Sequence, residues 1–91
     1  MTIETIPGRN AGNIMLYALS TCPWCRKTKD LFKELGVAYK FVDVDLLPDG
    51  EKASTMDDVK KCNPTISFPT ILINDKCIVG FRESEIRETL K

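Results

Sequence analysis

The stretch that decides the fold reads Ile14-Met15-Leu16-Tyr17-Ala18-Leu19-Ser20-Thr21-Cys22-Pro23-Trp24-Cys25. Its first six residues form a continuous apolar run of strand length, which is typical of a strand covered on both faces. Pro23 suits the first position of a helix, where a backbone N–H is not needed. The stretch therefore predicts a buried strand that leads directly into a helix, with two cysteines where the helix begins.

The predicted helix spans Pro23–Leu35. Apolar side chains and one threonine recur there at the spacing of a single buried helix face: Thr28, Leu31, Phe32 and Leu35. Gly36 follows, and glycine is the residue that most often ends a helix because it adopts the left-handed conformation.

The rest of the chain predicts further strands and helices in alternation. We expect a strand over Val37–Val44, a helix over Glu51–Lys61, a hairpin of strands Thr70–Ile73 and Cys77–Val79, and a last helix over Glu83–Leu90. The order is β-α-β-α-β-β-α, an α/β fold whose first half is a parallel crossover and whose second half makes the sheet mixed. Residues 1–13 are either a short edge strand or a loose arm. The expected core includes Tyr17, Phe32, Phe41, Leu72 and Ile78.

Composition excludes several functions. The chain has 91 residues, enough for one domain, and 13 Lys+Arg balance 13 Asp+Glu, so it has no positive field for nucleic acid or anionic membranes. It has no histidine, which excludes histidine-based catalysis and histidine metal ligands. No apolar run is long enough to span a membrane. The N-terminus lacks the apolar core of a signal peptide, so we expect a protein of the reducing cytoplasm. We also expect a monomer.

The chemistry is expected at Cys22-Pro23-Trp24-Cys25. At the start of a helix, free N–H groups and the helix dipole stabilise an anion, so the thiol of Cys22 should ionise more readily than a free cysteine. Arg26 and Lys27 add positive charge. Cys25 lies one turn deeper, where it could attack a mixed disulfide formed at Cys22. A structural pair or half of a zinc site is the alternative, but neither the position of the motif nor the lack of a second such motif favours it.

The other two cysteines, Cys62 and Cys77, lie on different predicted elements. Their separation disfavours a four-cysteine zinc site, either one could be a core residue, and the sequence does not assign them a role. We expect no bound metal or other cofactor.

A second signal is Phe68-Pro69, just before a predicted strand. Only a peptide bond that precedes proline has ready access to the cis form. A cis bond would turn the N–H and C=O of Phe68 outward, where they could pair with an extended substrate. A plain proline at a strand entry is the alternative.

Together, the Cys22–Cys25 motif, Phe68-Pro69-Thr70 and the Gly80 before the last helix resemble a dithiol glutaredoxin, or a glutaredoxin-like redoxin, of the thioredoxin fold. The resemblance covers about Ile14–Leu90 and identifies residues 14–91 as a glutaredoxin-like domain. It implies an enzyme that reduces protein or small-molecule disulfides, with Cys22 attacking, Cys25 resolving and Pro69 in cis. It also implies a substrate and thiol site made of Pro23, Trp24, Phe68, Pro69, Gly80, Phe81 and Arg82.

The sequence departs from the glutathione-using members of that family. Leu19 stands where many of them have a lysine, and Gly80-Phe81-Arg82 replaces their Gly-Gly pair. Gly-Phe-Arg is similar to redoxins that serve ribonucleotide reductase and accept electrons from thioredoxin reductase. The donor is therefore glutathione, another small thiol, or thioredoxin reductase, and the targets are disulfide-containing proteins, with ribonucleotide reductase a candidate.

Alternatives stay open for several of these residues. Arg82 could pair with an acid in solvent, Phe81 could belong to the core, and Trp24 could pack on its own helix. For the whole protein, the alternatives are an iron–sulfur carrier that uses Cys22, and a domain that docks a reductase without exchanging thiols itself. The intact pair of cysteines argues against both.

Overall fold

Strand β2 (Ile14–Ala18) is the centre of a five-stranded sheet. In the computed structural model, which describes residues 3–90, the strand order is β1-β3-β2-β4-β5. The other strands are β1 (Glu4–Ile6), β3 (Tyr39–Asp43), β4 (Thr70–Ile73) and β5 (Lys76–Val79). Strands β2 and β3 are parallel and the other neighbours are antiparallel, which confirms the predicted mixed sheet.

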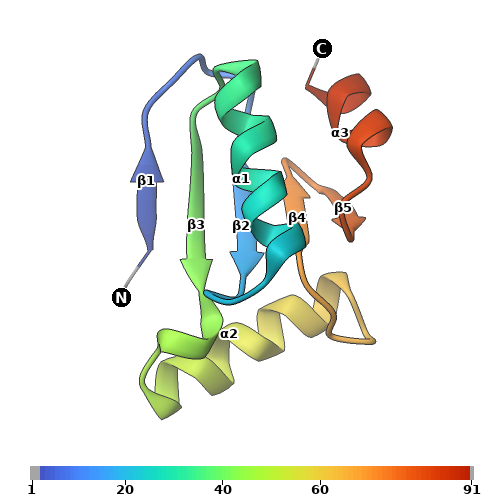
Figure 1. Cartoon of the computed structure of the whole chain (residues 1–91). Coiled ribbons are helices and arrows are strands. Elements are labelled where there is room, and N and C mark those ends of the chain that lie inside the picture. Colours follow the sequence, from blue (N-terminus) through green and yellow to red (C-terminus); the bar gives the residue numbers. More distant parts are fainter. Residues whose placement is uncertain (1–2, 91) are drawn as a thin grey trace.

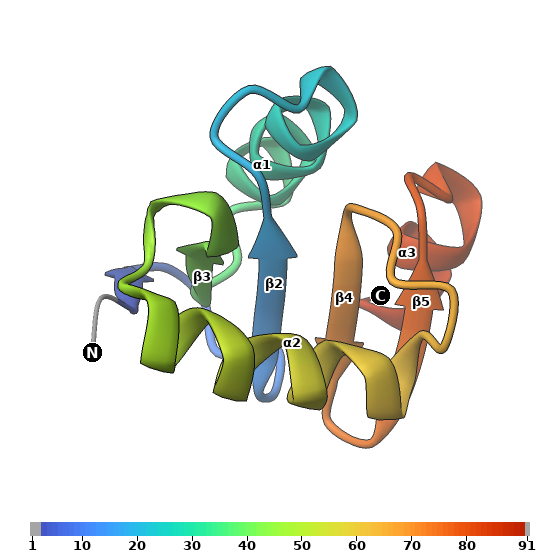
Figure 2. The ribbon, with the colours of Figure 1, turned by 90° about the horizontal axis from the view of Figure 1, so that it is seen from below.

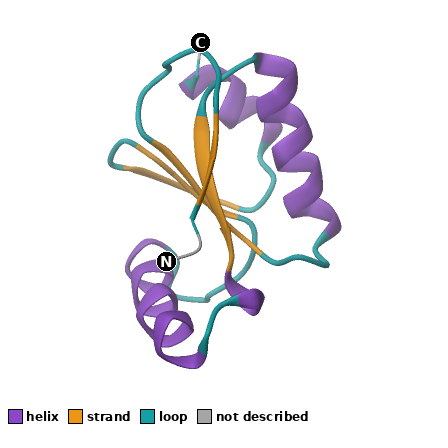
Figure 3. Ribbon diagram, turned by 90° about the vertical axis from the view of Figure 1, so that its left-hand side faces the viewer, coloured by secondary structure: helices purple, strands orange, loops and turns teal. Residues whose placement is uncertain are grey.

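The helices lie on both faces of this sheet (Figure 1). They are α1 (Pro23–Leu35), α2 (Asp49–Cys62) and α3 (Glu83–Thr89), and a short 3-10 helix, η1 (Val44–Leu46), precedes α2. Figure 2 shows α1 and α3 on one face and α2 across the other, and the three layers are also visible in Figure 3. This α/β arrangement confirms the predicted fold class, a thioredoxin fold.

The first helix has the predicted bounds because both of its ends are defined by the sequence. Pro23 occupies the first helical position, and Gly36 closes the helix in the left-handed conformation at φ 68°. The N–H of Gly36 donates to the carbonyl of Lys33 at 3.1 Å. The buried face carries Cys25, Thr28, Leu31 and Phe32.

Other boundaries differ from the prediction. The expected strand over Val37–Val44 is shorter, because Val44 begins η1 instead of continuing β3. The second helix is longer than expected and extends to Cys62. The predicted N-terminal edge strand is present as β1, which pairs antiparallel with β3 through Glu4 and Phe41. Residues 1–2 of the predicted arm and residue 91 of the predicted domain lie outside the described residues.

The core is divided between the two faces of the sheet. The larger part lies under α1 and α3, where Phe32 and Ile78 are fully buried as predicted. The smaller part lies under α2, around Val42, Val44 and Leu47. Phe41 and Tyr17 pack against these two parts of the core as predicted, but both are half-buried, as is Leu72. Tyr17 and Leu72 line a cavity, so part of each side chain stays open to solvent.

The structure gives Cys62 and Cys77 a role that the sequence left open. The two residues form a disulfide that joins the last residue of α2 to β5, with their Cα atoms 5.7 Å apart. Cys77 is exposed and Cys62 is half-buried, so neither is a core residue. Sequence spacing alone does not show that the end of α2 meets the edge strand β5.

Candidate active site

Cys22 is the residue that caps the N-terminus of α1. Its backbone is extended, and its Sγ accepts a hydrogen bond from the N–H of Cys25 at 3.2 Å. Its carbonyl accepts the N–H of Arg26 at 3.1 Å, the first backbone hydrogen bond of the helix. The sulfur thus lies at the N-terminal end of a 13-residue helix, where the first backbone N–H groups have no partner within the helix.

The loop that leads to Cys22 is held by a carboxylate that the sequence analysis did not identify. Asp45, in η1, accepts the N–H of Ser20 at 2.8 Å and the hydroxyl of Ser20 at 2.5 Å. These two hydrogen bonds, the hydroxyl contact first, lower the pKa of the Asp45 carboxyl. The 3-10 turn after β3 places Asp45 there, and a strand continued through Val44, as we predicted, would have hidden this contact.

Cys25 differs sharply from Cys22 in its surroundings. It is only 1% exposed and packs in the core on the buried face of α1. Burial is the main cause that raises its pKa to about 12, followed by its interaction with Cys22, while a backbone hydrogen bond with Leu19 and the charge of Lys29 act in the opposite direction. Cys25 is therefore a protonated thiol at neutral pH, adjacent to a sulfur that solvent can reach.

The Phe68–Pro69 bond is cis. The loop around it is organised by Asn63, which is 2% exposed and follows directly after α2. The Asn63 amide donates to the Ser67 carbonyl at 3.0 Å and to the Thr70 hydroxyl at 3.1 Å. The cis bond is thus held in a loop that is anchored by a buried, fully hydrogen-bonded side chain.

A cavity of about 200 Å³, which we call the aromatic groove, is lined in part by Trp24, two residues after Cys22. It is lined by five of the predicted site residues: Trp24, Phe68, Pro69, Gly80 and Phe81. Trp24 is 54% exposed and stacks on Phe81, with ring centroids 5.8 Å apart. The structure therefore brings together residues from α1, from the cis-proline loop and from the segment after β5.

Two contacts hold residues that line the groove. The Lys27 Nζ lies 4.6 Å from the Trp24 ring centroid, within cation–π distance of the ring. Gly80 adopts a φ of 85°, which favours glycine, and its N–H donates to the Pro69 carbonyl at 2.8 Å. This hydrogen bond ties the segment after β5 to the cis-proline loop.

The remaining predicted residues lie around this centre. Pro23 and Arg26 are exposed at the start of α1. Arg82 is exposed and its Nε donates to the Val79 carbonyl at 3.1 Å, so in this structure its side chain supports the end of β5. Arg82 does not line the aromatic groove.

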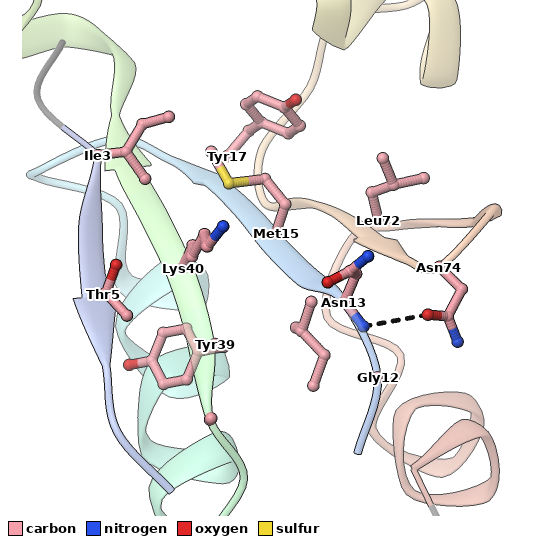
Figure 4. Close-up of a pocket in the computed structure, with 12 residues that line it drawn as sticks. Ile3, Thr5, Gly12, Asn13, Met15, Tyr17, Tyr39, Lys40, Leu72 and Asn74 are labelled. Atoms are coloured by element: carbon pink, nitrogen blue, oxygen red, sulfur yellow. Dashed lines mark hydrogen bonds between the residues drawn. The ribbon is translucent and has the colours of Figure 1, made fainter. Parts of the chain in front are cut away.

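A larger cavity, of about 540 Å³, lies elsewhere, on the part of the sheet that α2 leaves uncovered. Figure 4 shows Met15, Tyr17 and Leu72 along strands β2 and β4 at this site, and the N–H of Asn13 bonded to Asn74 at 3.0 Å. Cys22 and the other predicted site residues do not line it. Size alone therefore does not identify the reactive centre.

Two further searches concern the described residues only. Within residues 3–90, no group of three or more acidic or cysteine side chains is arranged to hold a metal ion. No helix in the same part of the chain is both long and apolar enough to cross a membrane.

Comparison with known proteins agrees with this geometry. The glutaredoxin family profile matches residues 14–78, which include both Cys22 and the cis-proline loop. The chain belongs to the glutaredoxin family. The chain is 35% identical over 78 residues to an uncharacterized glutaredoxin-like 8.6 kDa protein encoded in the rubredoxin operon of Clostridium pasteurianum, and the alignment covers 86% of this chain and 97% of that one.

Two solved structures are closely similar to this glutaredoxin-family chain. The glutaredoxin from Methanosarcina mazei Go1 superposes with a TM-score of 0.90 at 47% identity, over 97% of this chain and 86% of that one. The methanoredoxin of Methanosarcina acetivorans superposes with a TM-score of 0.88 at 51% identity, over 91% and 88% of the two chains. Membership of the glutaredoxin family supports a thiol–disulfide oxidoreductase type of function.

Proposed function

We propose that the protein is a dithiol disulfide reductase in which Cys22 attacks the substrate and Cys25 releases it. The observation that carries this proposal is the pairing of two unlike sulfurs. The Cys22 Sγ caps the start of α1, and the Cys25 thiol is buried one turn further along the helix. The backbone N–H of Cys25 donates to the Cys22 Sγ at 3.2 Å.

The first step forms a mixed disulfide. The Cys22 thiolate attacks one sulfur of a substrate disulfide, forms an S–S bond to it, and expels the other half as a thiolate that takes a proton from water. The N–H groups at the start of α1 stabilise the attacking sulfur. The backbone carbonyl and N–H of Phe68, next to the cis bond, would pair with an extended substrate backbone.

The second step releases the product. Cys25 loses its proton to water and attacks the Cys22 Sγ, so that the Cys22–Cys25 disulfide forms and the bond to the substrate breaks. The second half of the substrate leaves as a thiolate that takes up a proton from water. The high pKa of Cys25 keeps it protonated before this step, so it does not compete with Cys22 for the substrate. Two equivalents of a donor thiol then restore the two thiols and are themselves oxidised to one donor disulfide. A reductase can supply the two electrons instead.

The test uses two single variants. Cys22→Ser should abolish reduction of a disulfide substrate, whereas Cys25→Ser should stop after the first step and retain a mixed disulfide that mass spectrometry detects as an adduct on Cys22. Full activity of Cys22→Ser would refute the proposal. Iron and visible absorbance in an anaerobically purified sample would instead favour the iron–sulfur alternative.

The donor is a separate proposal. Glutaredoxins generally use glutathione, but Leu19 and the Gly80-Phe81-Arg82 segment lack the features that glutathione-using members carry at these positions. The small, aromatic and weakly charged groove fits a short thiol or the extended tail of a protein donor. Reduction of the oxidised protein should be compared for glutathione, for other small thiols, and for thioredoxin reductase with its nicotinamide cofactor; the fastest donor at equal concentration identifies the class.

The targets are also proposed. We expect disulfide-containing proteins, with ribonucleotide reductase as one candidate, and we expect the protein to act as a monomer. Reduction of oxidised ribonucleotide reductase, compared with a general disulfide protein such as insulin, tests the first expectation. Sedimentation analysis tests the second.

A further inference from the structure

The Cys62–Cys77 disulfide is separate from the two reactive thiols. Cys22 and Cys25 are free and lie at the start of α1, whereas Cys62 ends α2 and Cys77 lies on the edge strand β5. Cys77 is exposed and Cys62 is half-buried, so a small thiol can approach this bond from solvent. The mechanism proposed above makes no use of it.

One end of this disulfide is attached to the cis-proline loop. Asn63 follows Cys62 directly, and it is the buried residue whose amide holds the Ser67 carbonyl and the Thr70 hydroxyl. The loop between them carries the cis Phe68–Pro69 bond. The disulfide at Cys62 therefore restrains the residue next to Asn63. Asn63 holds the cis-proline loop, which forms one wall of the aromatic groove.

The other end is attached to the opposite wall. Cys77 pairs with Leu72 across the β4–β5 hairpin, and Val79 of the same strand pairs with Thr70. Directly after Val79, the Gly80 N–H bonds the Pro69 carbonyl at 2.8 Å, and the neighbouring Phe81 stacks on Trp24. The disulfide thus closes a loop with a sequence separation of 15 that contains the cis-proline loop, one wall of the groove. It joins this loop to β5, which leads into Gly80 and Phe81 on the other wall.

We propose that Cys62–Cys77 is a second redox couple, reached by small thiols from solvent, and that its reduction loosens the aromatic groove. This inference rests on the proposed function, because that function assigns substrate binding to the groove. A groove with looser walls binds disulfide substrates less tightly, so the state of this couple adjusts the affinity of the enzyme while leaving Cys22 and Cys25 in place.

An external thiol supplies the two electrons that reduce the Cys62–Cys77 disulfide. A thiolate attacks the exposed Cys77 Sγ, forms a mixed disulfide there, and expels Cys62 as a thiolate that takes up a proton. A second thiol attacks the mixed disulfide, releases Cys77 as a thiol and leaves as the oxidised dimer of the donor. Two thiols are oxidised for each Cys62–Cys77 bond reduced, and a small-molecule disulfide reverses both steps.

The test uses a Cys22→Ser/Cys25→Ser protein, in which the Cys62–Cys77 pair is the one remaining source of thiols. The oxidised sample is treated with dithiothreitol under native conditions and alkylated, and mass spectrometry counts the modified cysteines. Circular dichroism establishes that the reduced protein is still folded. We expect both cysteines to be alkylated in a folded protein; a bond that dithiothreitol leaves intact until the protein is denatured would overturn the proposal.

The coupling to the groove is read by amide hydrogen exchange in the same two samples. Reduction should raise the exchange rate of the Gly80 N–H, and of peptides that span residues 66–81, by about tenfold or more through local opening. A matched Cys22→Ser/Cys25→Ser/Cys62→Ser/Cys77→Ser protein should exchange at the faster rate with or without dithiothreitol. Equal exchange before and after reduction would overturn the proposal. Because both proteins lack Cys22 and Cys25, this result is independent of whether the proposed exchange reaction is right.

Discussion

The second step of the proposed exchange should accelerate with rising pH, because it needs the thiolate of Cys25. The pKa of Cys25 is raised from 9.0 to about 12, first by burial and then by interaction with Cys22. With this pKa, only about one Cys25 thiol in 10⁵ is ionised at about pH 7, and the ionised fraction grows about tenfold for each pH unit.

The mixed disulfide changes this value in a defined direction. Once Cys22 is bonded to the substrate it carries no charge, so its contribution to the raised pKa of Cys25 disappears, while the contribution of burial stays. The pKa of Cys25 in the intermediate should therefore lie between 9.0 and about 12. The rate of release should rise in proportion to hydroxide concentration throughout the range from about pH 6 to about pH 8, with no plateau.

The assay is a stopped-flow single turnover. Reduced protein is mixed with an excess of a disulfide whose two halves absorb differently, so that attack by Cys22 and release by Cys25 give separate signals. Cys25→Ser provides the control, since it should show the first signal and lack the second. A release rate that is constant between about pH 6 and about pH 8 would refute the reasoning, because it would mean that Cys25 is already ionised there.

Three further results are expected. Replacing both Cys62 and Cys77 by serine should lower the free energy of unfolding by about 3 kcal/mol, the value for a closed loop of 15 residues, and urea titration would contradict this with a loss below about 1 kcal/mol. Phe32→Ala should cost about 3–5 kcal/mol because the ring is fully buried, and an unchanged urea midpoint would show that the site collapses to fill the space. Asp45→Asn should slow the first exchange step by loosening the loop at Ser20. Asp45→Glu is the matched control that keeps the charge. An unaltered first-step rate in Asp45→Asn would show that Asp45 does not position this loop for the reaction.

The pKa of Asp45 also gives a pH dependence with a defined sign. Its pKa is lower in the folded protein than in the unfolded chain, so the folded state binds its proton less readily. The stabilisation is therefore present above the ordinary carboxyl pKa and is lost as the pH falls below it. Acid should loosen the loop before Cys22 in the wild-type protein and have a smaller effect in Asp45→Asn, which backbone amide NMR of Ser20 would detect.

The parts of the fold that the sequence predicted well are those with local signals. The bounds of α1 follow from Pro23 and Gly36, whose backbone preferences act at single positions. The parallel pairing of β2 and β3 follows because α1 lies between them in the sequence. A helical crossover returns the chain to the same end of the sheet, so the two strands run in the same direction. The cysteine motif was found for the same reason, since its chemistry depends on its place at the start of that helix.

The parts that the sequence did not predict depend on contacts between distant segments. The Cys62–Cys77 bond exists because the end of α2 meets β5, and the Ser20–Asp45 contact exists because η1 turns back towards the loop before α1. Neither leaves a periodic pattern in the sequence. Half-burial of Tyr17 likewise reflects the cavity that this residue lines, which a hydrophobic run cannot reveal.

The three-residue strand β1 has a consequence for the behaviour of the protein at high concentration. It pairs with β3 and so satisfies backbone groups that would otherwise form a free border of the sheet. Such a border is a template for strands of other molecules. Removing the first seven residues should therefore produce a chain that still folds around β2 but self-associates, with aggregates that grow by intermolecular strand addition on the exposed side of β3.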